Sequence, residues 1–261
     1  YVPADSMSTE DTWNAWVATP NIDTITGFSI TQNDDAAKAT LGSNFDVAVT
    51  EWNWNGWYGG NYAAADLAQP DMAKGLGAAG FLHGFMRDGD KIKIGCQSMT
   101  VGKGWGITGI RVDPDYEQDA VMLPTGQVTG LYANYHGNKM LKTEYQNIPT
   151  YVQPYKMNAI QPQDKVATLD ILTTKSENQL FVHVINRSFA EDITLDITLE
   201  DIKVSNNYSR YALIGDNTAR IKNTELKQTA NIEEMRFDNA SENFSVEVPN
   251  SSVAAFVFEL E

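Results

Sequence analysis

The pattern of apolar and polar residues changes near residue 145. Before that point, short apolar runs at 45–50 and 92–96 alternate with segments at 66–87 and 127–141, whose apolar residues recur at helical spacing. This strand–helix–strand–helix order predicts parallel strands joined by crossover helices. Because both runs are largely apolar, we expect strands that are buried on both faces.

Local signals refine the limits of the expected helices. The Ala-rich segment 33–41 predicts a further short helix. A break in the helical segment 66–87 is expected at Pro70. The turn chemistry of Asp88-Gly89-Asp90 is expected to end this segment.

After residue 145 the chain is a series of short β-rich segments separated by polar turns such as 175–178. Alternation is clear in several of them, as in Leu180, Val182 and Val184. This spacing predicts an antiparallel β-sandwich. The segments are 166–174, 179–186, 193–199, 208–214, 244–248 and 253–259.

The fold class is therefore α/β plus all-β, with one domain expected over 1–145 and a β-sandwich domain over 146–261. The first part supplies only two or three strand–helix units. A closed eight-stranded barrel needs about 200 residues or more. The first part is thus expected to be either a small open sheet or the end of a larger barrel.

The stretch 47–58 carries the clearest chemical signal. β-favouring residues lead directly into the carboxylate of Glu51, which is followed by three tryptophans, a tyrosine and two asparagines. Strand ends hold reactive carboxylates rigidly in barrel enzymes. Aromatic rings stack on sugar C–H faces, and amides bond to sugar hydroxyls. The alternative is a core strand that enters an aromatic loop, with Glu51 capping a helix.

Composition narrows the choice of partners. The 261 residues carry a net charge of −15 with 42% hydrophobic residues, and the pI is near 4.5. This balance argues against nucleic acid, whose phosphates need clustered Lys and Arg, and it suits a neutral polysaccharide. No signal peptide and no apolar run of transmembrane length are present, so no membrane partner is predicted.

The single cysteine, Cys96, excludes an internal disulfide and is expected to lie buried in a strand as a small apolar residue. The chain opens at Tyr1-Val2-Pro3 without Met, which favours a processed or partial product. An extracellular or periplasmic location is favoured over a cytoplasmic one.

Other candidate groups have simpler explanations. The run Asp113, Asp115, Glu117 and Asp119 supplies oxygens that calcium prefers, but it lacks the glycine and the final glutamate of an EF-hand loop, so a solvated acidic loop is favoured. The three histidines lack metal-ligand spacing, and His83 and His183 are expected to be packing or surface residues. We therefore predict no metal and no cofactor. No Gly-x-Ser-x-Gly elbow supports a serine hydrolase.

The order of motifs resembles the C-terminal half of the glycoside hydrolase family 51 α-L-arabinofuranosidases, from about residue 40 to the end. In that family a strand ends in Asp/Thr-Glu-Trp-Asn, then Trp-Tyr, and an Ala-rich helix with Phe-Leu-Asn and Phe-x-Arg follows. After it come a strand, a helix with a Leu-Tyr pair, and a β-sandwich with Phe-Val-x-Asn-Arg-Ser. The matching segments here are Thr50-Glu51-Trp52-Asn53, Trp57-Tyr58, residues 78–87, 91–96, 131–135 and 181–188.

The resemblance implies the C-terminal part of a (β/α)8 TIM barrel followed by an antiparallel β-sandwich. It also implies a retaining glycosidase that acts on α-L-arabinofuranosides or a related plant or algal polysaccharide, with Glu51 as the nucleophile. Retaining hydrolysis needs a second carboxyl group about 5–5.5 Å away. The only earlier glutamate is Glu10, in a polar stretch that reads as a helix start or a loop. The acid/base residue is therefore expected outside this chain.

The expected partners are an oligosaccharide or polysaccharide and the missing N-terminal half of the barrel, from the same precursor or a second chain; a homo-oligomer is left open. Substrate contacts are expected from aromatic and amide side chains, namely Tyr1, Trp52, Asn53, Trp57, Gln97 and Trp105. Trp105 fits a sugar platform and a packed loop anchor equally well.

Two departures from the family pattern bear on the substrate. An insertion, Trp54-Asn55-Gly56, displaces the aromatic residue after the nucleophile. Gln97 is the candidate for a glutamine that touches the sugar in the family, but ungapped alignment places Met99 there. The alternative function is a non-catalytic carbohydrate-binding or structural β-sandwich protein.

Overall fold

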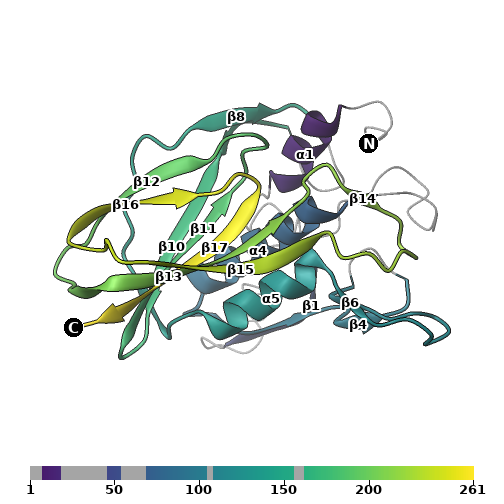
Figure 1. Ribbon diagram of the computed structural model, residues 1–261, viewed down its shortest axis with the longest axis horizontal. Coiled ribbons are helices and arrows are strands. Elements are labelled where there is room, and N and C mark those ends of the chain that lie inside the picture. Colours follow the sequence, from purple (N-terminus) through teal and green to yellow (C-terminus); the bar gives the residue numbers. More distant parts are fainter. Residues whose placement is uncertain (1–7, 19–45, 54–68, 105–107, 156–161) are drawn as a thin grey trace, which may run out of the picture.

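In the computed structural model, residues 8–18, 46–53, 69–104, 108–155 and 162–261 are described (Figure 1). A six-stranded antiparallel sheet forms the centre, in the order β15-β13-β17-β11-β10-β7. The strands span Ala230–Phe237 (β15), Val204–Gly215 (β13), Ser252–Leu260 (β17), Gln179–Asn186 (β11), Leu169–Lys175 (β10) and Lys139–Leu141 (β7).

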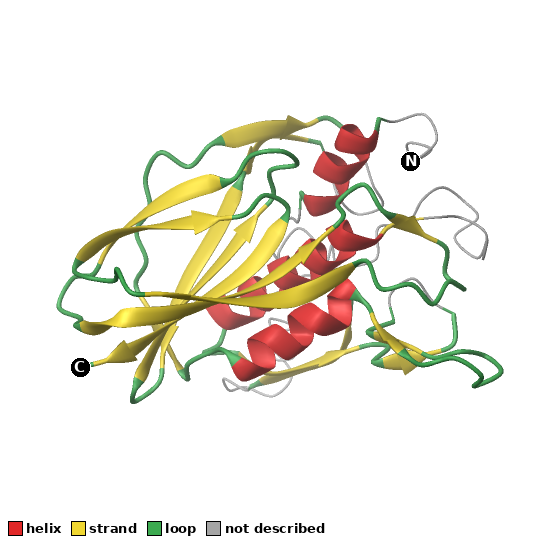
Figure 2. Cartoon of the chain, viewed as in Figure 1, coloured by secondary structure: helices red, strands yellow, loops and turns green. Residues whose placement is uncertain are grey.

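Different layers cover the two faces of this sheet (Figure 2). The antiparallel pair of β12 (Ile193–Thr198) and β16 (Asn243–Val248) packs on one face through an apolar cluster that includes Val182, Phe256 and Val246. The helices α4 (Asp71–Arg87) and α5 (Pro124–Asn134) pack on the other face. The predicted β-sandwich is confirmed, and one of its sheets also has a helical cover.

The strands that are buried on both faces are β11 and β17, at the centre of the sheet. They are not the two strands for which this burial was predicted. Leu180 and Val184 face β12 and β16, whereas Ile185 faces the helices. The alternation read from the sequence of β11 is therefore correct, and both of its faces lie in apolar surroundings.

The helices begin as the sequence indicates. Pro70 precedes α4 with a φ of −67°, and Pro124 occupies the first turn of α5, where no main-chain donor is lost. Asp71 and Arg87 lie in the first and last turns of α4, each favourable to the helix dipole. The expected break at Pro70 is thus the start of the helix.

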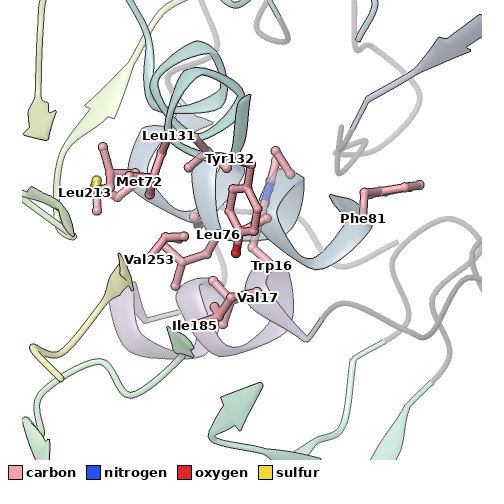
Figure 3. Close-up of a cluster of buried hydrophobic side chains, with 14 of the residues drawn as sticks. Trp16, Val17, Met72, Leu76, Phe81, Leu131, Tyr132, Ile185, Leu213 and Val253 are labelled. Carbon is pink, nitrogen blue, oxygen red and sulfur yellow. The ribbon is translucent and has the colours of Figure 1, made fainter. Parts of the chain in front are cut away.

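A third helix, α1 (Thr9–Val17), starts at Ser8, whose Oγ accepts the main-chain N–H of Asp11. Glu10 lies in its first turn, as expected for a helix start. Indoles from this helix complete the core beneath α4 and α5, where Trp16 and Val17 lie near Ile185 and Val253 (Figure 3).

The helix predicted over 127–141 is too long. The helix ends at Asn134, and residues 139–141 form β7, which pairs with β10. Gly137 lies between them at a close approach, because a Cβ there would stand 2.1 Å from the main-chain carbon of Lys175. A helix cannot pass this point, and the chain turns into the sheet. The domain boundary at 145 stays a prediction, although β7 precedes it.

A parallel pair of strands lies on the far side of α4 and α5 from the large sheet (Figure 1). It consists of β1 (Val47–Trp52) and β3 (Ile92–Gln97). The expectation that both strands are buried on both faces was wrong, because Ala48, Ile94 and Cys96 are exposed. The helices cover one face, and no described element covers the other.

The remaining strands are short or peripheral. The segment predicted as one strand over 166–174 divides at Thr168 into two, and β15 was missed because most of its side chains are polar and exposed. The short strands are β2 (Gln69–Pro70) with β14 (Arg220–Ile221), β8 (Thr150–Gln153) with β9 (Gln163–Ala167), and β4 (Val101–Gly102), β5 (Ile110–Arg111) and β6 (Val121–Met122). The helix predicted over 33–41 lies outside the described residues.

Gly126, in the first turn of α5, permits a close approach of Gly109, which bonds the segment that follows β3. A Cβ at this position would stand 2.4 Å from the carbonyl oxygen of Gly109, and the N–H of Gly109 donates to the carbonyl of Met99. We expect Gly126→Ala to lower the free energy of unfolding by about 1–3 kcal/mol, measured by urea denaturation, because main-chain atoms must shift. Gly130→Ala is the matched control.

A Cβ at Gly130 meets nothing within 4 Å. Gly130→Ala should therefore stabilise the chain by up to about 1 kcal/mol through helix propensity alone. Equal effects of the two substitutions would contradict the assigned close approach.

Candidate active site

Glu51 lies exposed near the C-terminal end of β1. Because β1 and β3 are parallel, their C-terminal ends meet at one edge. Ser98 follows β3 directly, and its Oγ donates to Oε1 of Glu51 at 3.0 Å. Its main-chain N–H donates to the carbonyl of Trp52 at 2.9 Å, which extends the pairing by one residue. The carboxylate is thus held between two strand ends.

An irregularity in the pairing explains where Glu51 points. Val49 pairs with Gly95 and Trp52 pairs with Gln97, so β1 advances three residues while β3 advances two. Thr50 and Glu51 together lie opposite Cys96, as in a β-bulge, which re-aims side chains. Glu51 is therefore exposed while the neighbouring Trp52 is buried.

The indole of Trp52 packs beneath α4. It is 5% exposed, stacks on Phe81 with ring centroids 5.6 Å apart, and meets Phe85 edge-on at 5.4 Å. The ring presents no open face for a sugar to stack on. It fixes the end of β1 to the helix instead.

The amides of Asn53 and Gln97 also make contacts within the protein. Nδ2 of Asn53 donates to the carbonyl of Ser98 at 2.5 Å. Gln97 accepts from Oγ1 of Thr129 at 2.9 Å and donates to the carbonyl of Thr125 at 3.3 Å. Gln97 thus fixes β3 to α5. Their predicted roles in substrate binding stay predictions.

The other predicted substrate contacts, Tyr1, Trp57 and Trp105, lie outside the described residues. Cys96 is exposed, so the expectation of a buried thiol was wrong. It lies on the face of β3 that the helices do not cover.

The acidic run 113–119 does not gather its carboxylates. Asp113 is buried, and its Oδ2 accepts the main-chain N–H groups of Glu117 and Gln118, both at 3.0 Å. Asp115, Glu117 and Asp119 are exposed. Within the described residues, no group of three or more His, Cys, Asp or Glu could hold a metal ion.

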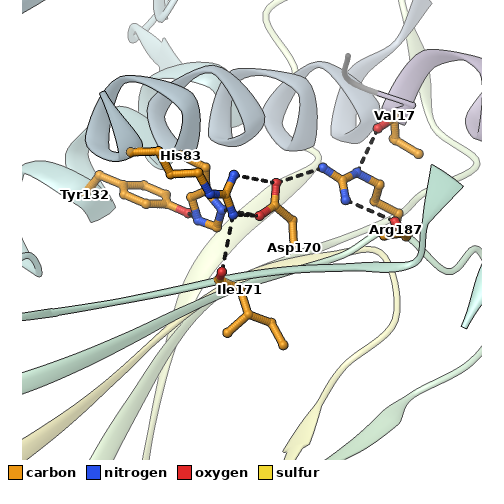
Figure 4. A network of polar contacts seen from close by, with 8 residues as sticks. Val17, His83, Tyr132, Asp170, Ile171 and Arg187 are labelled. Atoms are coloured by element: carbon orange, nitrogen blue, oxygen red, sulfur yellow. Dashed lines mark hydrogen bonds and ion pairs between the residues drawn. The ribbon is translucent and has the colours of Figure 1, made fainter. Parts of the chain in front are cut away.

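A polar network that is buried around His83 and Arg187 joins the helices to the large sheet (Figure 4). Asp170, on β10, accepts from Arg87 of α4 and from Nη2 of Arg187 at 3.1 Å. Nδ1 of His83 lies 3.0 Å from the same carboxylate, and Nε2 of His83 bonds the hydroxyl of Tyr132 at 2.6 Å. Arg187 also donates from Nε to the carbonyl of Val17 at 3.0 Å, so the network reaches α1.

Sequence reasoning expected His83 and His183 to be packing or surface residues, and both are fully buried. The ring of His183 stacks on that of Tyr132 at 5.1 Å, and its Nε2 lies 3.3 Å from Oγ1 of Thr174. The ring of His83 is 0% exposed at the centre of the network, whereas the side chain of Arg87 at its edge is 43% exposed. Its contacts join α4 and α5 to the sheet.

A second buried charged cluster lies at the start of α4. Oδ2 of Asp71 accepts from Oγ1 of Thr229 at 2.6 Å. Burial lowers the pKa of Lys74 to about 8, against the opposing effect of Asp71. Nη1 of Arg111 donates to the carbonyls of Lys222 and Glu225. These contacts join α4 and β5 to the segments around β14 and β15.

The two buried histidines make the fold sensitive to acid. Burial lowers the pKa of His83 below 6.5, against the effect of Asp170, and it lowers the pKa of His183 well below 6.5. Below about pH 6.5 the unfolded chain therefore binds more protons than the folded chain. This stabilising contribution is complete above about pH 6.5 and is lost as pH falls below it, by at most about 1.4 kcal/mol per pH unit for each histidine.

Urea denaturation between pH 5 and 8 measures this slope. We expect His183→Gln to make stability less dependent on pH below 6.5. An unchanged slope for His183→Gln would contradict a buried neutral imidazole.

Comparisons with known proteins agree with this architecture. The crystal structure of the alpha-L-arabinofuranosidase from Thermotoga maritima, an arabinose complex, superposes with a TM-score of 0.73 at 17% identity, over 95% of this chain and 50% of that chain. The GH51 enzyme of Thermotoga petrophila gives a TM-score of 0.67 at 18% identity, over 89% and 48%. A family 51 alpha-L-arabinofuranosidase from Bifidobacterium longum gives 0.69 at 13%, over 99% and 51%.

The fold is therefore that of the C-terminal part of the family 51 arabinofuranosidases, and the chain spans about half the length of these proteins. The sequence itself matches the family model of the alpha-L-arabinofuranosidase C-terminal domain over residues 51–252. The chain belongs to this family. No curated protein matches it in sequence. Among the described residues, no helix is long and apolar enough to cross a membrane.

Proposed function

We propose that this chain is the C-terminal portion of a retaining glycoside hydrolase that acts on α-L-arabinofuranosides or a related polysaccharide, with Glu51 as the nucleophile. The observation that carries the proposal is the exposed Glu51 carboxylate at the C-terminal end of β1, held by Ser98 from the end of the adjacent parallel strand. Parallel strand ends are where barrel enzymes place reactive groups. A helix cap, the alternative role for Glu51, does not account for a carboxylate held between two strands.

The reaction proceeds in two balanced steps. The carboxylate of Glu51 attacks the anomeric carbon, the bond to the leaving oxygen breaks, and a second carboxylic acid gives that oxygen a proton. Water then attacks the same carbon, the second group takes a proton from the water, and the ester to Glu51 breaks. The anomeric configuration is retained because the carbon is inverted twice.

The second carboxyl group and the rest of the barrel are proposed to come from a segment outside this sequence, in the same precursor or in another chain. Glu10 does not suit the role, because it lies in the first turn of α1 rather than at a strand end. The open face of β1 and β3 supports this view, since Ile94 is 54% exposed there. An apolar strand residue of a closed barrel faces a packed interior.

The test is covalent trapping in the complete hydrolase. A mechanism-based arabinofuranosyl label with a good leaving group should form a stable ester, and mass spectrometry of the digested protein should place one glycosyl group on the peptide that contains Glu51. Labelling of a different carboxylate would assign the nucleophile elsewhere. Sugar binding without any labelling would favour a non-catalytic carbohydrate-binding protein.

A further inference from the structure

We propose that Ser98 is a positioning residue for Glu51, with its hydroxyl holding one carboxylate oxygen so that the other faces the anomeric carbon. The inference rests on the proposed function and adds a residue that the family motif around Glu51 does not contain. Ser98 stands 47 residues from Glu51 in the sequence, on a different strand.

Three contacts join Ser98 to the segment 51–53. Its Oγ donates to Oε1 of Glu51 at 3.0 Å. Its main-chain N–H donates to the carbonyl of Trp52 at 2.9 Å, and its carbonyl accepts from Nδ2 of Asn53 at 2.5 Å. Both main-chain polar groups of Ser98 are thus bonded to the two residues that follow the nucleophile, and the position of its hydroxyl is set by that pairing.

The rest of the surroundings keeps this arrangement in place. Trp52 is locked under α4 by Phe81 and Phe85, and Gln97, next to Ser98, is fixed to α5 by Thr129 and Thr125. The two strand ends are therefore each anchored to a helix. Glu51, in contrast, is exposed, and the hydroxyl of Ser98 is the side-chain donor recorded for it among the described residues.

The first reaction step depends on how the carboxylate of Glu51 is oriented. An ionised carboxylate only accepts hydrogen bonds, so the Ser98 hydroxyl must donate to it. The nucleophile attacks as a carboxylate, and the hydroxyl holds that carboxylate in one orientation. The hydrogen bond from Ser98 to Oε1 restricts rotation of the carboxylate, so Oε2 is the oxygen that attacks the anomeric carbon. Orientation of this kind contributes substantially to rate.

The experiment compares Ser98→Ala and Ser98→Thr in the complete hydrolase. We expect Ser98→Ala to slow both covalent labelling and kcat/KM by about 10- to 100-fold, the range for a hydrogen bond to a charged group. KM should be nearly unchanged, because the hydroxyl orients the nucleophile and is not proposed to contact the sugar. Ser98→Thr keeps the hydroxyl and should recover most of the rate.

Ser245→Ala is the matched control, because Oγ of Ser245 likewise donates to an exposed carboxylate, that of Asp196, at 2.6 Å on the sandwich. It should leave the labelling rate unchanged. A Ser98→Ala enzyme with the labelling rate and kcat/KM of the control would overturn the proposal, while labelling that still depends on Glu51 would leave the proposed function intact. If Glu51 is not labelled in the wild type, the proposed function itself fails.

Discussion

Glu51→Gln should abolish covalent labelling and lower kcat by at least about 10³-fold, because an amide cannot supply the attacking oxygen anion. The substitution keeps the size and shape of the side chain, and the hydroxyl of Ser98 can still donate to the amide oxygen at the same place. Since Glu51 is exposed, little packing is at stake. The loss should therefore appear in the glycosylation step, measured by pre-steady-state release of an aryl leaving group.

Rescue of Glu51→Ala by a small anion distinguishes loss of the nucleophile from loss of the fold. The space left by the side chain admits a small anion such as azide, which can attack the anomeric carbon in its place. We expect azide to restore turnover of an activated aryl arabinofuranoside and to yield a glycosyl azide of inverted configuration. Glu10→Gln, which changes an exposed carboxylate in the first turn of α1, should retain full activity. An equal loss in Glu10→Gln would point to a general effect of charge.

The sequence predicted the location of Glu51 but not its surroundings. The β-favouring run before it was enough to indicate a strand that ends in a carboxylate. Burial of that strand was predicted wrongly, because apolar composition cannot tell whether a neighbouring layer is present in the chain. Ala48, Ile94 and Cys96 are exposed on a face that no described element covers. Largely apolar runs therefore indicated strands correctly but not their neighbours.

The contacts that hold the site were not predictable from local pattern. Ser98 meets Glu51 only because β1 and β3 pair in one register, and the irregularity opposite Cys96 decides which side chains are exposed. The helix over 127–141 was predicted too long because helical spacing alone does not register the close approach at Gly137. Alternation was sufficient for β11, whose two faces lie in different apolar layers.

The sequence signal for the polar network around Asp170 was the presence of charged residues in or beside apolar segments. Asp170 and Arg187 lie in or directly after β-rich segments, where a charge is costly unless it is paired. Asp170 is 83 residues from Arg87, so only the folded chain shows the pairing. The sequence could have indicated that both residues need partners, but not which ones.

Asp170→Asn should be the most destabilising single substitution considered, with a loss of about 3–5 kcal/mol in the free energy of unfolding. Burial alone would raise the pKa of Asp170, but His83, Arg187 and Arg87 hold it well below its usual range, so the folded chain carries an ionised carboxylate. An amide cannot compensate Arg187, whose side chain is only 5% exposed. The contacts of α4 and α1 with β10 would weaken together.

Urea denaturation at pH 7.5 measures this loss, with Asp196→Asn as the control because Asp196 is an exposed strand aspartate that bonds Ser245. The control should change stability by less than about 1 kcal/mol, as expected for surface polar groups. Because the depressed pKa of Asp170 stabilises the fold only above that pKa, the difference between wild type and Asp170→Asn should shrink in strong acid, where both side chains are neutral. A difference that stays constant down to pH 2 would show that the carboxylate charge does not hold the helices on the sheet.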